Sequence, residues 1–302
     1  MDSIEERIKK LKQEKNAVIL AHYYQCPEIQ QIADYVGDSY YLSKIAKETG
    51  QELIIFCGVR FMAESAKIRS PHKKVLLPVA DAGCPMADMA DINKIKALRK
   101  QYPDGAVVCY INTSVEVKAL CDVCVTSSNA FDIIRKLPER TIIFLPDRNL
   151  SAYIADKCPE KEFIIYPGYC IVHNKILPEH IMELKIKHPN VPVVAHPECR
   201  KEVLAFANFV GSTGEMLSYA KSSDSSELIV VTEEGIRYAL EQQNPRKIFH
   251  FPYPQIICAN MKKTTIENVL WALEDETTEI HIDEALRISA LNCLNAMHRL
   301  GN

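Results

Sequence analysis

The sequence lacks any uninterrupted apolar run close to the roughly 20 residues that a membrane-spanning helix needs. It also lacks an excess of charge of either sign, since 36 basic and 39 acidic side chains leave a formal net charge of -3. A basic surface for nucleic acid and an acidic tail are therefore not expected. With 47% hydrophobic and 25% charged residues, the composition disfavours a disordered, collagen-like or coiled-coil protein. We expect a cytoplasmic protein that binds neither membrane nor nucleic acid.

Cysteine, by contrast, is abundant. The chain contains 11 cysteines, an odd number that cannot pair completely, and a reducing cytosol would keep disulfides open. Free cysteine is among the most buried residue types and behaves as a small apolar side chain. Packing is thus the default role of each cysteine, and a chemical role needs further support from the sequence.

Four kinds of segment recur along the chain every 86 to 88 residues. They are an apolar run that ends in a polar pair, a hydroxyl cluster, a second apolar run, and a third apolar run followed by a cysteine. The polar pairs are His22 and Tyr24, Tyr110 and Asn112, and His196 and Glu198; the hydroxyls are Ser39, Ser127 and Thr213; the cysteines are Cys84, Cys170 and Cys258. Self-similarity at a fixed spacing is typical of a repeated structural unit, here of small-domain size.

The apolar runs are short, continuous and rich in isoleucine, valine and leucine, as in strands buried on both faces. Helical periodicity between them predicts parallel sheets flanked by helices. The predicted fold is α/β, with three Rossmann-like αβα domains of about four parallel strands each, related by a pseudo-threefold axis around a central cavity. We expect domains at residues 1–86, 87–172 and 173–261. Residues 262–302 should complete the first domain, because their apolar stripe would pack back on it.

Ligands of open parallel sheets bind beyond the carboxyl ends of the strands. The polar pairs, hydroxyls and cysteines all follow apolar runs at such ends, so three sheets with a common axis would bring them into one cavity. Each polar pair sits at positions i and i+2 of a strand, which point to the same side. These pairs offer acid–base groups and hydrogen-bond donors. The hydroxyls precede helices, where they can bind an anion or simply cap the helix.

One cysteine from each repeat, at the same loop position, is what a shared metal site on the axis requires. Three thiolates can hold a 4Fe-4S cluster and leave its fourth iron open as a Lewis acid. A zinc site with three cysteines fits the same soft ligands, and a purely structural role is the third alternative. Cys121 and Cys124 form the only CxxC pair, which has no counterpart in the other repeats. We therefore favour packing for this pair.

Ten segments spread over nearly the whole chain resemble those of quinolinate synthases. They are LAHYYQ, GDSYYLS, GVRFMAESAKI, GCPMADM, YINTS, VTSSNA, PGYCIVH, HPECR, GSTGEM and CANMKKTT. The resemblance implies a 4Fe-4S enzyme of NAD biosynthesis, built from three pseudo-symmetric αβα domains. Such an enzyme condenses iminosuccinate with dihydroxyacetone phosphate to quinolinate, phosphate and water. One departure from the family's usual pattern is Tyr23, where asparagine is common.

The resemblance also implies the roles of individual residues. The cluster ligands would be Cys84, Cys170 and Cys258. The substrate pocket would be lined by His22, Ser39, Tyr110, Asn112, Ser127, His196, Glu198 and Thr213. The catalytic groups would be His22, Tyr24, His196 and Glu198, with Tyr24 and Glu198 transferring protons. The open iron would bind a substrate carboxylate or hydroxyl.

The expected partners are the two small-molecule substrates, and docking of the enzyme that makes iminosuccinate stays an open question. Two other functional classes also stay open. One is an iron–sulfur redox sensor or electron carrier, and the other is a zinc-stabilised binding module.

Overall fold

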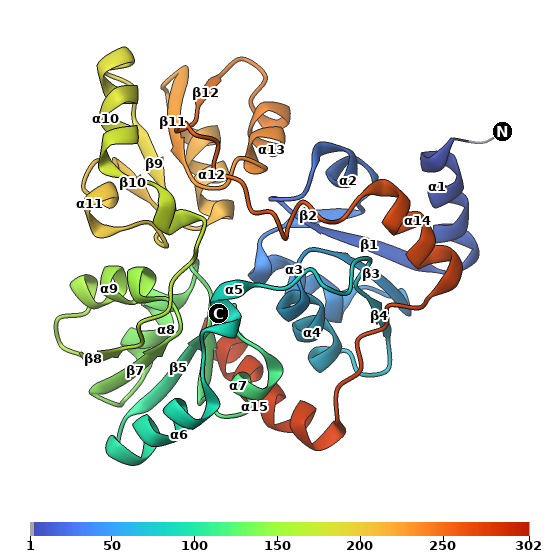
Figure 1. Cartoon of the computed structure of the whole chain (residues 1–302), viewed down its shortest axis with the longest axis horizontal. Coiled ribbons are helices and arrows are strands. Elements are labelled where there is room, and N and C mark those ends of the chain that lie inside the picture. Colours follow the sequence, from blue (N-terminus) through green and yellow to red (C-terminus); the bar gives the residue numbers. More distant parts are fainter. Residues whose placement is uncertain (1–2, 302) are drawn as a thin grey trace.

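Three four-stranded sheets organise residues 3–301, the part of the chain that this computed structural model describes. All strand pairs are parallel. The strand order is the same in each sheet: the first strand lies between the second and the third, and the fourth lies beyond the third. Figure 1 shows the three units around a common centre. The predicted α/β fold with three Rossmann-like αβα domains is confirmed.

The first unit follows the expected alternation of helix and strand. Its strands are β1 (Ala17–His22), β2 (Tyr35–Gly37), β3 (Leu53–Cys57) and β4 (Lys74–Leu76). Its helices are α1 (Ile4–Glu14), α2 (Pro27–Ile32), α3 (Ser39–Glu48) and α4 (Arg60–Arg69).

The second and third units repeat this alternation. The second contains α5 (Pro85–Asp88), α6 (Ile92–Gln101), β5 (Ala106–Tyr110), α7 (Val115–Lys118), β6 (Val123–Val125), α8 (Ala130–Lys136), β7 (Thr141–Leu145), α9 (Arg148–Lys157) and β8 (Glu162–Ile165). The third contains η1 (His173–Lys175), α10 (Pro178–Lys187), β9 (Val193–Ala195), α11 (Lys201–Leu204), β10 (Phe209–Val210), α12 (Thr213–Ser222), β11 (Glu227–Val231), α13 (Ile236–Gln243) and β12 (Ile248–His250). Within residues 3–301, no helix is both long and apolar enough to cross a membrane.

The central strands are apolar throughout because both of their faces are covered. In β1, Val18 and Leu20 belong to a large core that runs through all three units. Ile19 and Ala21 face a second core, which α1 and the later helix α14 (Ile266–Asp275) complete. A strand covered on both faces gains from apolar side chains at every position. This burial on both faces explains the runs of isoleucine, valine and leucine in the sequence.

The C-terminal helices depart from the prediction. Helix α14 packs on α1 and β3 of the first unit as expected, but α15 (Glu284–Leu300) packs mainly on α7, α8 and β6 of the second unit and reaches the first through α4. The expectation that the whole tail completes the first domain is therefore wrong for α15. An apolar stripe shows that one helix face is buried, but it does not specify which unit covers that face.

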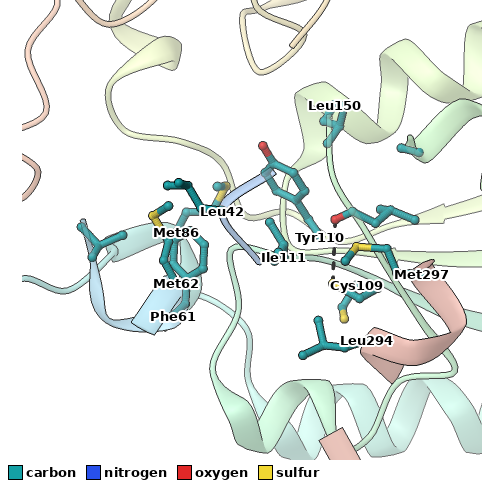
Figure 2. Close-up of a cluster of buried hydrophobic side chains, with 14 of the residues drawn as sticks. Leu42, Phe61, Met62, Met86, Cys109, Tyr110, Ile111, Leu150, Leu294 and Met297 are labelled. Atoms are coloured by element: carbon teal, nitrogen blue, oxygen red, sulfur yellow. Dashed lines mark hydrogen bonds between the residues drawn. The ribbon is translucent and has the colours of Figure 1, made fainter. Parts of the chain in front are cut away.

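Four cysteines lie in the core that α15 closes. Cys109 and Cys293 are fully buried with their sulfur atoms 3.5 Å apart, and Cys121 and Cys124 of the CxxC pair are buried beside Cys109. Figure 2 shows Cys109 next to Leu294 and Met297. Among the described residues, none of the four belongs to a group of three side chains that could hold a single metal ion. The packing role favoured for Cys121 and Cys124 agrees with this position.

His298 connects α15 with the first unit. Its ring stacks on Tyr40 with the ring centroids 5.1 Å apart, and its Nε2 atom contacts Arg69. Burial, followed by the charges of Arg69 and two nearby lysines, lowers the pKa of His298 to about 3. A histidine in the unfolded chain titrates near pH 6.5, to within about one unit.

As the pH falls from about 6.5 towards 3, the unfolded chain therefore gains a proton that the folded chain does not bind, and stability is lost over this interval. His298→Gln removes the titrating group and keeps a hydrogen-bond acceptor for Arg69. We expect the free energy of unfolding of this variant to fall less steeply on acidification than that of the wild type. Urea titrations at a series of pH values across the interval measure this, and equal slopes would contradict the assignment.

Candidate functional site

The central strands end at a cavity that all three units share. β1 ends at His22, β5 ends at Tyr110, and β9 ends directly before His196. The cavity is lined by every residue that the sequence predicts for the site: His22, Tyr24, Ser39, Cys84, Tyr110, Asn112, Ser127, Cys170, His196, Glu198, Thr213 and Cys258. The site therefore belongs to the assembly of three units and not to a single sheet.

His22 and His196 occupy equivalent turns in the first and third units. The backbone N–H of Tyr24 donates to Nδ1 of His22 at 3.0 Å, and that of Glu198 donates to Nδ1 of His196 at 3.3 Å. Burial is the largest cause that lowers the pKa of each ring to about 3. Both imidazoles are thus neutral, and the hydrogen bond at Nδ1 assigns the proton to Nε2. Each ring can donate one hydrogen bond with a fixed orientation.

Glu198 is a buried carboxylate with a partner at each oxygen. The hydroxyl of Tyr110 donates to Oε1 at 2.7 Å, and Nδ1 of His173 lies 2.7 Å from Oε2. Burial by itself raises the pKa of Glu198, but His173, His196 and the hydrogen bonds outweigh it and hold the pKa below its ordinary value. The carboxylate is therefore ionised and can accept a hydrogen bond at each oxygen.

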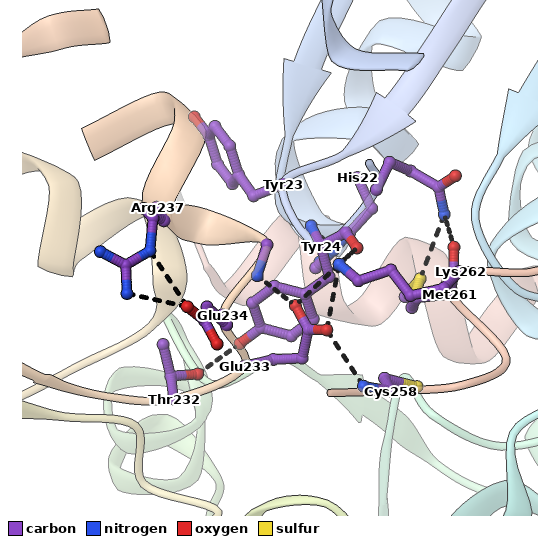
Figure 3. Close-up of polar contacts among 12 residues, drawn as sticks. His22, Tyr23, Tyr24, Thr232, Glu233, Glu234, Arg237, Cys258, Met261 and Lys262 are labelled. Carbon is purple, nitrogen blue, oxygen red and sulfur yellow. Dashed lines mark hydrogen bonds and ion pairs between the residues drawn. The ribbon is translucent and has the colours of Figure 1, made fainter. Parts of the chain in front are cut away.

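Tyr24, Thr232 and His173 extend this contact into a chain of hydrogen bonds. The hydroxyls of Tyr24 and Thr232 lie 2.7 Å apart, and Oγ1 of Thr232 lies 2.8 Å from Nε2 of His173. Figure 3 shows the contact between Tyr24 and Thr232. Burial raises the pKa of Tyr24 well above its ordinary value, so its phenol is protonated. One consistent direction follows: Tyr24 donates to Thr232, Thr232 donates to His173, and Nδ1–H of His173 donates to Glu198.

The three repeated cysteines enter the same cavity from the loops after β4, β8 and β12. Burial raises the pKa of each thiol, that of Cys84 to about 12. Their sulfur atoms do not all lie within 4.8 Å of one another. One tetrahedral zinc ion with bonds of about 2.3 Å would need sulfur atoms about 3.8 Å apart, whereas a polynuclear cluster binds each thiolate to a different iron. The donor set and its spacing fit an iron–sulfur cluster better than a single zinc ion.

Two buried carboxyl groups hold the cysteine loops. The backbone N–H of Cys170 donates to Asp147 at 3.0 Å, and that of Cys258 donates to Glu233 at 3.0 Å. Burial raises the pKa of Asp147 to about 8, and burial also raises the pKa of Glu233, although the ion pair with Lys262 at 3.1 Å opposes it. Buried carboxylates are retained only where hydrogen bonds or charges satisfy them. Here they fix the backbone next to the two thiols.

Further polar groups from all three units face the cavity. Oδ1 of Asn112 is buried, and no described group hydrogen-bonds to it, so it is free to bind a ligand. Ser39 and Thr213 are the first residues of α3 and α12, whose caps are Asp38 and Ser212. The hydroxyls of Ser39 and Thr213 therefore do not cap these helices, and that of Thr213 donates to the Tyr24 hydroxyl at 3.3 Å. Helix N-termini carry a partial positive charge that favours anions.

The sequence profile of the Quinolinate synthetase A protein (NadA) family matches residues 6–299. Over 298 residues, or 99% of both chains, the sequence is 54% identical to a quinolinate synthase of Clostridium perfringens. The chain belongs to the quinolinate synthase family. It is also 52% identical over 294 residues to a quinolinate synthase of Clostridioides difficile, covering 97% of both chains. It is 49% identical over 301 residues to a quinolinate synthase of Caldicellulosiruptor bescii, covering 100% of this chain and 99% of the relative.

Two residues of the chain of hydrogen bonds, His173 and Thr232, have no counterpart of the same type in the other two units. His173 follows Cys170 by three positions, where the other units have Ala87 and Met261. Thr232 follows β11, and the units before it have proline and glycine at the corresponding positions. The repeat therefore carries no signal for either residue. Only the segment PGYCIVH, part of the resemblance to quinolinate synthases, contains His173.

We expect Thr232→Val to break the chain of hydrogen bonds while preserving side-chain shape. Loss of a proton path should reduce kcat for quinolinate formation at least tenfold, since positioned proton transfer contributes about 10²–10⁴-fold. Iron content should not change, because Thr232 touches none of the three cysteines through a hydrogen bond. The measurement is steady-state quinolinate formation together with iron analysis.

The matched control is Thr264→Val, at a buried threonine whose hydroxyl has no partner among the described residues. Equal kcat values for the two variants would show that Thr232 has no part in proton transfer.

Proposed function

We propose that this member of the quinolinate synthase family condenses iminosuccinate with dihydroxyacetone phosphate to quinolinate, phosphate and water, with one 4Fe-4S cluster per chain. The observation that carries the proposal is that one cysteine from each unit lines the cavity that also contains the hydrogen-bonded chain from Tyr24 to Glu198. A redox sensor or electron carrier would have no use for this acid–base chain.

Cys84, Cys170 and Cys258 would hold the cluster as thiolates. Burial without a metal disfavours their charged forms, and binding to iron would offset that penalty. When bound through three protein thiolates, such a cluster supplies one open iron as a Lewis acid for a substrate oxygen. The carboxylates of Asp147 and Glu233 would keep two of the cysteine loops in place.

Tyr24 and His173 would move protons, and Glu198 would stabilise the proton on His173. When the Tyr24 hydroxyl takes a proton from substrate and passes its own to Thr232, the charge comes to rest on His173 next to the ionised Glu198. A histidine–carboxylate pair in general acid–base catalysis works in the same way, because the carboxylate stabilises the protonated imidazole. Reversal of the same path returns the proton to a leaving hydroxyl. His22 and His196, which are neutral, would orient substrate oxygens through Nε2–H.

Both substrates are anionic, and the cavity offers matching groups. Lys175 is the only lysine or arginine among the described residues that line it. The N-termini of α3 and α12, with the hydroxyls of Ser39 and Thr213, supply further positive potential for phosphate or carboxylate. Ser127 and Asn112 add hydrogen-bonding groups from the second unit.

The experiment that tests this proposal is purification without oxygen, followed by iron and sulfide analysis and by an assay with both substrates. We expect about four iron and four sulfide per chain and formation of quinolinate. Cys84→Ser, Cys170→Ser and Cys258→Ser should each abolish the cluster, and Cys121→Ser should retain it. A colourless zinc protein, or a cluster that depends on Cys121, would refute the assignment.

Glu198→Gln should separate proton transfer from cluster binding. The amide keeps the shape of the side chain but loses the charge that stabilises His173. We expect a decrease in kcat of at least about 100-fold, with the visible spectrum of the cluster unchanged. Wild-type turnover in this variant would exclude the proposed part of Glu198.

A further inference from the structure

Three metal-binding side chains gather on the third unit, outside the central cavity. His188 caps the C-terminal end of α10, Glu227 is the first residue of β11, and His250 is the last residue of β12. Glu227 lies at the amino end of its strand, opposite to the end at which the cavity lies. The three residues therefore form a cluster that is separate from the proposed catalytic site.

The ligand atoms of this cluster all lie within 4.8 Å of one another. Nε2 of His250 lies 2.7 Å and Nδ1 of His188 lies 3.7 Å from the same oxygen, Oε2 of Glu227. The two imidazole rings stack with their centroids 3.7 Å apart and an interplanar angle of 27°. In a tetrahedral site with bonds of about 2.0–2.1 Å, ligand atoms are about 3.3 Å apart. Both observed distances lie within about 0.6 Å of that value.

The backbone around each ligand is already fixed. The N–H of His188 donates to Leu184 at 2.8 Å, and the strand pairing of β11 with β12 aligns Ile229 with His250. The side chains are 28%, 34% and 18% exposed for His188, Glu227 and His250, respectively. Water can therefore occupy the remaining coordination positions, while little backbone movement is needed to bind an ion.

The internal repeat shows that the fold does not require histidine or glutamate at these places. The positions equivalent to Glu227 are Leu53 and Thr141, the first residues of β3 and β7. The strand register makes Leu76 and Ile164 the counterparts of His250. The helix caps that correspond to His188 are Lys15 and Tyr102. The same architecture thus forms twice without this cluster, and only the third unit assembles two imidazoles and a carboxylate.

We propose that His188, Glu227 and His250 bind one divalent ion of the zinc class, with water in the open coordination positions. Two neutral imidazoles and one carboxylate suit borderline ions such as Zn²⁺, Co²⁺ and Ni²⁺. Mg²⁺ and Ca²⁺ prefer sites made of oxygen atoms only. Without an ion, one carboxylate oxygen is shared by two stacked rings, and two protonated rings in that arrangement would repel each other.

The test is equilibrium dialysis of the enzyme, purified without oxygen, against Zn²⁺, with metal analysis by mass spectrometry. We expect the wild type to bind one zinc ion per chain more than Glu227→Gln or His250→Asn. Each substitution should lower the affinity for this zinc ion by more than about tenfold. Even the loss of a residue that only hydrogen-bonds to a metal ligand lowers metal affinity by about 10–100-fold. His281→Asn, at an exposed histidine elsewhere in the chain, is the matched control and should bind zinc like the wild type.

The readout does not depend on the proposed reaction, because it is a difference in bound zinc between variants with the same cysteines. When Co²⁺ replaces Zn²⁺ at this site, the protein should show the weak visible absorption bands of cobalt with nitrogen and oxygen ligands. It should show no added charge-transfer absorption from thiolate ligands. Circular dichroism confirms that the variants are folded. Equal zinc binding by wild type, Glu227→Gln and His250→Asn would overturn the proposal. The proposal would also be overturned if His281→Asn lost as much bound zinc as the two ligand variants.

Discussion

A parallel sheet places the carboxyl ends of all its strands at one edge, and the central cavity of this protein depends on that constraint. Equivalent turns after the first strands place His22, Tyr110 and His196 at one cavity. The loops after the fourth strands place the three repeated cysteines there as well. No single unit supplies all the groups that line the cavity, so the packing of the three units creates it.

The units contribute unequally to that cavity, and the proposed chemistry depends on residues that differ between them. The third unit contains His173, Glu198 and Thr232, while the first and second units provide the phenols of Tyr24 and Tyr110 at the two ends of the chain. Burying an ionised carboxylate is unfavourable unless hydrogen bonds and opposite charge compensate. The contacts of Glu198 with Tyr110 and His173 provide this compensation. The contact with Tyr110 also joins the second and third units.

The sequence predicted the sheets and the lining of the cavity because both follow from local patterns that repeat. Buried strands read as apolar runs, and residues at the same repeat position occupy the same place in each unit. His173 could not be predicted in this way, since alanine and methionine stand at the equivalent positions. The packing of α15 on the second unit could not be predicted either, because its apolar stripe fits any apolar surface. Its contacts with α7 and β6 depend on tertiary packing. The tautomers of His22 and His196 depend on backbone hydrogen bonds that a sequence does not display.

The central claim is that one cysteine from each unit holds a cluster with an iron that has no protein ligand. Mössbauer spectroscopy of the enzyme enriched in ⁵⁷Fe tests it most directly. With a substrate or product bound, the account predicts that one iron of the cluster acquires a spectrum distinct from the other three, since only an open iron can bind a ligand. Four irons that do not respond to any ligand, or iron that is absent from the protein purified without oxygen, would contradict the account.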